Sequence, residues 1–111
     1  MSDTEPPFQA VLLENAVGFR LSGELDLATV REMRAMLATL PVDGNPVTLD
    51  LADLSFMDST GLHAFEQYAR TLNGANSLVL ENVPHHIRRL FEITGVDRNP
   101  LIEIRTQVEH G

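Results

Sequence analysis

The sequence predicts an α/β domain with a mixed sheet that is opened by an antiparallel hairpin. Its 111 residues are enough for one compact domain with its own core. Along the chain, short apolar runs suited to strands alternate with segments in which apolar residues recur at helical spacing. This alternation is typical of parallel strand pairs joined by right-handed crossovers, and two adjacent strand-like runs at the start predict the hairpin.

The hairpin is expected between Phe8 and Ser22, where two short β-type runs flank a turn at Glu14-Asn15. Residues 1–7 precede it, end in two prolines and lack apolar periodicity, which predicts a flexible N-terminal tail. A helix follows Gly23 and ends before Pro41, with Thr29 or Asp26 as its N-terminal cap. Its buried face is predicted from Val30, Met33, Leu37 and Leu40.

After a turn-rich loop, Val47–Leu51 is predicted as a strand because apolar and polar residues alternate, and residues 52–58 are predicted as a polar bend. A second helix then ends near Asn73-Gly74. Its apolar face consists of Leu62, Phe65, Tyr68, Ala69 and Leu72.

The last third of the chain predicts a strand, a helix and a final strand. Ser77–Glu81 suits a strand buried on both faces. Pro84 stands at the first position of a helix that Gly95 ends, with Ile87, Leu90 and Phe91 on its apolar face. With a final strand at Leu101–Ile104, the domain is expected to span residues 8–105, followed by a C-terminal tail at 106–111.

The composition excludes several classes of function. Sixteen acidic residues against eight arginines and no lysine give a net charge of −8, which repels DNA, RNA and anionic lipid over most of the surface. The absence of lysine excludes Schiff-base chemistry and a P-loop, and the absence of cysteine excludes thiol catalysis and thiolate zinc sites. The apolar runs are far shorter than the roughly 20 residues of a membrane span, and the acidic N-terminus shows no secretory signal. We therefore expect a cytoplasmic protein that needs no cofactor.

Candidate functional residues gather between the strand at 47–51 and the following helix. This connection leads to a helix N-terminus, which presents free N–H groups and the positive end of the helix dipole. Ser59 is expected within the first two helical positions, with its hydroxyl near solvent. The simplest interpretation of Asp58-Ser59-Thr60 is a helix N-cap.

Three enzymatic interpretations fit less well. Asp58-Ser59-Thr60-Gly61 is one residue longer than the Asp-Thr-Gly of aspartic proteases and lies in a different context. A hydrolase that pairs Ser59 with His63, His85 or His86 would lack the Gly-x-Ser-x-Gly elbow. A metal site at His85 and His86 is disfavoured because adjacent helical residues point about 100° apart.

Two blocks, Leu21–Asp26 and Asp50–Leu62, resemble the STAS domain family, and within it the single-domain anti-sigma factor antagonists of bacteria. Weaker similarity continues through Ile87–Phe91 and Thr94–Val96, so the resemblance covers roughly residues 8–104. It implies a sheet with helices packed mainly on one side and no enzymatic turnover.

The resemblance also implies a mechanism. Ser59 matches the serine that a partner anti-sigma kinase phosphorylates, and Asp26 and Asp58 match two acidic positions near the phosphoacceptor. The unphosphorylated antagonist binds the kinase and frees the sigma factor, and a metal-dependent serine/threonine phosphatase resets it. The partner-binding residues implied are Ser59, Thr60, Gly61 and Asp26.

Two departures from the family pattern are visible. Thr60 stands where serine is frequent, which adds a second hydroxyl, and the seven residues after Ile104 leave little room for the family's C-terminal helix. STAS-like domains also serve as subunits of signalling scaffolds and of lipid-trafficking transporters. In that alternative function Ser59 is not phosphorylated.

Overall fold

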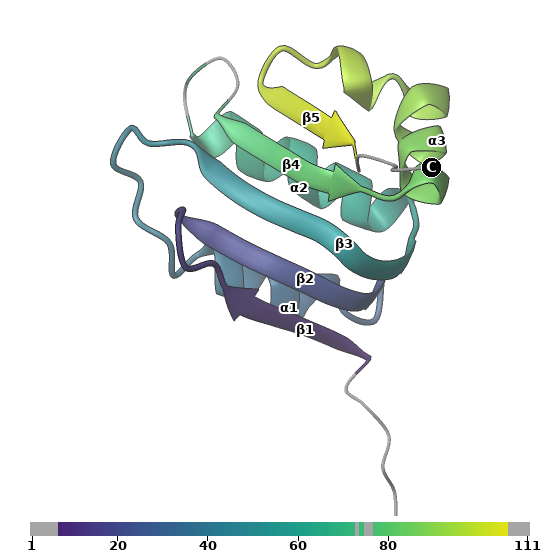
Figure 1. Cartoon of the computed structure of the whole chain (residues 1–111), viewed down its shortest axis with the longest axis horizontal. Helices are drawn as coiled ribbons and strands as arrows, with labels where there is room; N and C mark the ends of the chain where they lie inside the picture. The colour runs from purple at the N-terminus through teal and green to yellow at the C-terminus, as the bar shows by residue number, and fades with distance from the viewer. Residues whose placement is uncertain (1–6, 73, 75–76, 107–111) are drawn as a thin grey trace, which may run out of the picture.

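A computed structural model describes residues 7–72, 74 and 77–106, which form a five-stranded sheet with three α-helices. The elements are β1 (Phe8–Leu12), β2 (Gly18–Leu25), α1 (Val30–Leu37), β3 (Val47–Met57), α2 (Ser59–Thr71), β4 (Leu78–Val83), α3 (His85–Thr94), a 3₁₀ turn η1 (Val96–Arg98) and β5 (Ile102–Thr106). The strands lie in chain order across the sheet; β1 is antiparallel to β2, and every other pair is parallel. In Figure 1, α1 and α2 lie behind the sheet on one face. The predicted fold class is confirmed.

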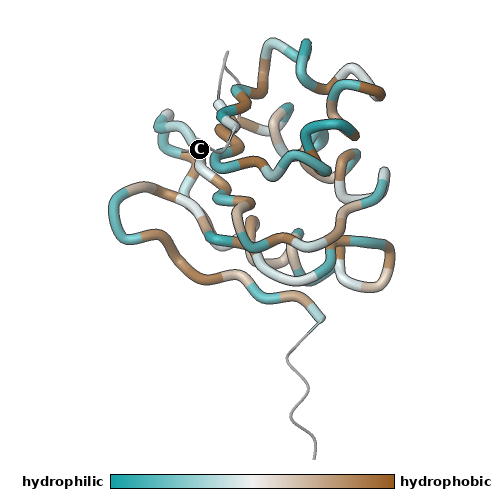
Figure 2. The backbone as a smooth tube through the Cα atoms, turned by 45° about the vertical axis from the view of Figure 1, so that its right-hand side comes forward, coloured by the Kyte–Doolittle hydropathy of each residue, from teal (hydrophilic) through white to brown (hydrophobic). Residues whose placement is uncertain are grey.

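The core lies between this face of the sheet and the helices. Figure 2 shows short hydrophobic stretches that alternate with hydrophilic ones along the backbone. The buried residues of α1 are Val30, Met33 and Leu37, and those of α2 include Leu62, Phe65 and Ala69, as the spacing predicted. Helix α3 adds Ile87 and Phe91 to the same core. Among the described residues, no helix is both long and apolar enough to cross a membrane.

The predicted bend at residues 52–58 is wrong, because β3 continues to Met57. Strand β2 pairs with β3 along most of its length through two register shifts, each of which accommodates one extra residue of β3. Leu54 and Met57 are buried, whereas Asp53 and Ser55 are exposed. Tertiary pairing therefore overrides the local turn preference and brings the carboxyl ends of β2 and β3 side by side (Figure 1).

The structure shifts several expected boundaries by one or two residues. Pro84 is the N-cap of α3 rather than its first helical residue, since its ψ of 155° is extended, and Gly95 ends α3 with a φ of 84°, as predicted. Pro7, expected in the tail, accepts a hydrogen bond from the Glu24 N–H at 2.8 Å. Strand β5 runs through Thr106. Residues 1–6 and 107–111 of the two expected tails lie outside the described residues, as does Asn73 near the end of α2.

Candidate functional site

The candidate site lies at the edge of the sheet where β2 and β3 end and α2 begins. Leu25 and Met57 are register partners at the last paired position of the two strands. The Asp58 N–H donates to the Leu25 carbonyl at 3.2 Å, which links the two strand ends. Asp26 and Ser59 follow directly, so the structure brings the sequence-predicted site residues together at one edge.

Asp58 is the N-cap of α2. Its backbone is extended, with φ −111° and ψ −172°, and its Oδ1 accepts a hydrogen bond from the Thr60 N–H at 2.9 Å. The Asp58 carbonyl accepts the first helical bond, from Leu62 N–H, at 3.3 Å. The capping interpretation of this residue is therefore confirmed.

Ser59 is the first residue of α2 and is exposed, and Thr60 beside it is half-buried. Within the described part of the chain, the Ser59 hydroxyl makes no hydrogen bond, whereas the backbone N–H of Thr60 is held by the cap. A primary hydroxyl on solvent at a helix N-terminus can be modified without disturbing the core, and the positive end of the dipole tolerates added negative charge there.

Asp26 lies in the turn between β2 and α1. Its Oδ1 accepts a hydrogen bond from the Ala28 N–H at 3.0 Å, and its carbonyl accepts from the Val30 N–H at 2.8 Å. Thr29 occupies the N-cap position of α1 without a side-chain cap bond; its buried hydroxyl donates to the Glu24 carbonyl at 2.8 Å. The turn that presents Asp26 is thus fixed by its own hydrogen bonds.

Gly61 differs from the other predicted site residues because it is buried. A Cβ at this position would lie 2.8 Å from Leu25 Cγ and 3.1 Å from Met57 Cγ. These distances are shorter than ordinary van der Waals contact, so glycine allows α2 to start directly against the ends of β2 and β3. Gly61 therefore allows the first turn of α2, which begins at Ser59, to pack closely against the two strand ends.

The site is negatively charged. None of the ion pairs among the described residues involves Asp26 or Asp58; the nearest along α2 joins His63 Nδ1 to Glu66 Oε1 at 3.6 Å. The described residues contain no group of three or more His, Cys, Asp or Glu side chains that could hold a metal ion. The adjacent ends of β2 and β3 therefore present an exposed serine and two carboxylates, and no cation among the described residues pairs with either carboxylate.

Two exposed hydrophobic residues flank the site and were missed by sequence reasoning. Leu27, directly after Asp26, is 78% exposed, and Phe56, two residues before Asp58, is 46% exposed. Leucine and phenylalanine are usually buried, so no signal in the sequence separates these two residues from those of the core.

The fold and site together define a small α/β domain that presents an exposed serine at the start of the helix following its longest strand. A family model described as "Mlab, STAS domain" matches residues 8–104. The chain therefore belongs to the STAS domain family.

Several relatives carry the name anti-sigma-B factor antagonist. The protein of this name from Bacillus subtilis (strain 168) is 34% identical over 99 residues, which cover 88% of this chain and 89% of the relative. One from Staphylococcus epidermidis is 37% identical over 92 residues, covering 81% of this chain and 85% of the relative.

Solved structures agree on the fold. The crystal structure of an anti-sigma factor antagonist from Mycobacterium paratuberculosis has a TM-score of 0.70 at 20% identity and covers 86% of this chain and 85% of its own. The anti-sigma factor antagonist SpoIIAA in its unphosphorylated form has a TM-score of 0.64 at 27% identity and covers 90% of this chain and 89% of its own.

Proposed function

We propose that this protein is an anti-sigma factor antagonist whose binding to an anti-sigma serine kinase is controlled by phosphorylation of Ser59. The observation that carries the proposal is the exposed Ser59 hydroxyl at the start of α2, beside the Asp58 cap and the Asp26 turn. The names of the relatives support the same function. In its unphosphorylated form the protein binds the kinase in the cytoplasm and so releases a sigma factor, without catalytic turnover of its own.

The surface around Ser59 suits a protein partner. Leu27 and Phe56 offer apolar area that a partner can bury, while Ser59 and Thr60 offer hydrogen-bonding groups. In this proposal Asp26 and Asp58 form the acidic environment of the phosphoacceptor, and Gly61 acts through the position of α2. A metal-dependent serine/threonine phosphatase removes the phosphate and restores binding.

We expect the kinase to phosphorylate Ser59 and not Thr60. Ser59 is the more exposed of the two, and its primary hydroxyl is less hindered than that of a β-branched residue. Incubation with the candidate kinase and ATP, followed by peptide mapping with mass spectrometry, measures this directly. Ser59→Ala should abolish incorporation, and Thr60→Val is the matched control that should retain it. Phosphate on Thr60 with Ser59 unmodified would contradict the assignment.

Asp58 should affect phosphorylation separately from stability. Asp58→Asn keeps an oxygen that can accept the bond from the Thr60 N–H, so the free energy of unfolding should change little; Asp58→Ala should lose about 1 kcal/mol. Because Asn lacks the negative charge that we assign to the acceptor's surroundings, Asp58→Asn should still slow phosphorylation. Urea unfolding and the initial rate of phosphate incorporation test the two effects. A normal rate of phosphorylation in Asp58→Asn would show that Asp58 acts only as the N-cap of α2.

The alternative is a STAS subunit of a signalling scaffold or of a lipid-trafficking transporter. The description of the matching family model, "Mlab, STAS domain", names the domain without naming an antagonist, which is consistent with this alternative function. In this alternative function, Ser59 is only the first residue of α2 and is not phosphorylated. No phosphate would be incorporated by any anti-sigma kinase encoded nearby, and neighbouring genes for transporter components would favour it.

A further inference from the structure

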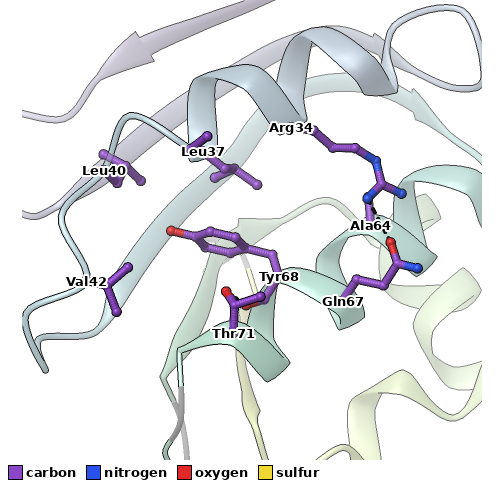
Figure 3. A pocket seen from close by; sticks show the side chains of 9 residues that line it. Arg34, Leu37, Leu40, Val42, Ala64, Gln67, Tyr68 and Thr71 are labelled. Atoms are coloured by element: carbon purple, nitrogen blue, oxygen red, sulfur yellow. Dashed lines mark hydrogen bonds between the residues drawn. The ribbon is translucent and has the colours of Figure 1, made fainter.

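A second feature lies away from Ser59, in the gap between α1 and α2. A cavity of about 330 Å³ opens there, between the second half of α1, the loop that follows it and the second half of α2 (Figure 3). Leu37, Leu40 and Ala64 are buried and give it an apolar interior, while Val42 is 69% exposed at its rim. Its volume lies within the range of sites that hold small molecules.

Tyr68 contributes a polar group without a partner. Its ring projects from α2 into the gap, and its hydroxyl points toward Leu40 and Val42 (Figure 3). Among the described residues, this hydroxyl is the buried side-chain oxygen that makes no hydrogen bond, and burial raises the pKa of the Tyr68 phenol above its ordinary 10.0. The neighbouring Thr71 hydroxyl does not help, because it donates to the Tyr68 carbonyl at 2.6 Å. Buried hydroxyls nearly always have partners, so this donor is available to an acceptor that the described residues do not supply.

Arg34 and Gln67 stand at the other end of the cavity. Arg34 Nη1 donates to Gln67 Oε1 at 2.7 Å, which bridges α1 and α2 (Figure 3). Both residues are exposed, and within the described part of the chain no carboxylate lies within ion-pair distance of Arg34. The guanidinium has five N–H donors in a planar fork that matches a carboxylate, and one such bond to Gln67 leaves most of them free.

We propose that this cavity binds a small amphipathic carboxylic acid whose far end carries an acceptor oxygen. The carboxylate pairs with Arg34, the apolar body fills the space between Leu37, Leu40 and Ala64, and the acceptor oxygen takes the Tyr68 hydroxyl bond. At the packing density of protein interiors, roughly 0.74, the cavity holds on the order of a dozen non-hydrogen atoms. The monomethyl ester of octanedioic acid has this size and both polar ends.

Calorimetric titration of the unphosphorylated protein with this monoester tests the proposal, with backbone amide NMR shifts to locate the bound molecule. We expect the shifts to centre on Arg34, Gln67 and Tyr68. Arg34→Gln should lower the affinity at least tenfold, whereas Arg31→Gln, which removes an exposed arginine of α1 outside the cavity lining, should not change it. Tyr68→Phe should lower the affinity for the monoester without affecting that for octanoate, which lacks the second acceptor.

A filled cavity provides an independent check. Ala38 lines the cavity from an exposed position at the end of α1, so Ala38→Leu should occupy the space and abolish binding while the circular dichroism spectrum stays unchanged. No binding at about 10 mM monoester, or binding that Arg34→Gln and Tyr68→Phe leave intact, overturns the proposal. The titration needs neither kinase nor phosphate, so its outcome is independent of the function proposed for Ser59.

Discussion

Phosphorylation of Ser59 should weaken binding to the anti-sigma kinase about a hundredfold, which corresponds to about 2.7 kcal/mol. The phosphate adds about −1.5 to −2 charges to a surface that already carries Asp26 and Asp58, neither of which forms an ion pair with another described residue. A partner that accepts a neutral hydroxyl must then desolvate or repel a dianion. In the free protein, the N-terminus of α2 stabilises that same charge. Phosphorylation should therefore lower the affinity of the complex without lowering the stability of the fold.

The charge at position 59 should set the order of kinase affinities among four forms of the protein. Wild type and Ser59→Ala should bind more tightly than the other two forms, because neither carries added charge at position 59. Ser59→Glu adds one negative charge, fewer than phosphate, and should bind with intermediate affinity. Phosphoserine should bind most weakly. Calorimetric titration against the kinase measures all four.

Two controls separate local repulsion from other causes. Thr39→Glu adds the same charge at an exposed position beyond the end of α1 and should leave the affinity unchanged. If repulsion dominates, raised salt should reduce the difference in kinase affinity between wild type and phosphoprotein. If the phosphate excludes the partner sterically, salt should leave that difference unchanged. Equal affinities for all four forms would favour the scaffold or transporter function, in which Ser59 is only the first residue of a helix.

The parts of this site that could be predicted rest on local chemistry. An aspartate directly before a helical pattern caps that helix wherever the helix packs, so Asp58 and the exposed Ser59 followed from spacing alone. The end of β3 could not be predicted in this way. Asp53 and Ser55 have turn propensity, and only pairing with β2 through two register shifts holds them in a strand.

The cavity was also beyond reach of sequence patterns. Periodicity correctly placed Tyr68 on the apolar face of α2, where it packs against the core. Periodicity carries no information on the distance between α1 and α2, and that distance decides whether the phenol hydroxyl meets a hydrogen-bond partner. The exposure of Leu27 and Phe56 depends likewise on which neighbours the tertiary fold provides.

We expect the position of Ser59 to depend on the close packing of Gly61 against Leu25, and exchanging the sizes of these two residues should reveal that dependence. Gly61→Val places new carbon atoms where even a Cβ lies 2.8 Å from Leu25 Cγ, and should destabilise the protein by about 3 kcal/mol. Leu25→Ala removes a fully buried side chain and should cost about 2 to 5 kcal/mol. In the double variant the valine occupies the space that the leucine has left. The combined loss in free energy of unfolding should therefore be smaller than the sum of the single losses by at least about 1 kcal/mol.

Urea unfolding of the four proteins in this cycle gives the coupling directly, and Leu78→Ala supplies the control. Leu78 is equally buried but begins β4, at the opposite end of the parallel strands from Leu25, so its loss should add to that of Gly61→Val without coupling. Because α2 starts at Ser59, Gly61→Val alone should also shift the serine outward and lower kinase affinity, and the double variant should recover part of it. If the losses in free energy of unfolding add for Gly61→Val with Leu25→Ala as well as with Leu78→Ala, then α2 moves away from β2 freely. Gly61 would then not set the position of Ser59.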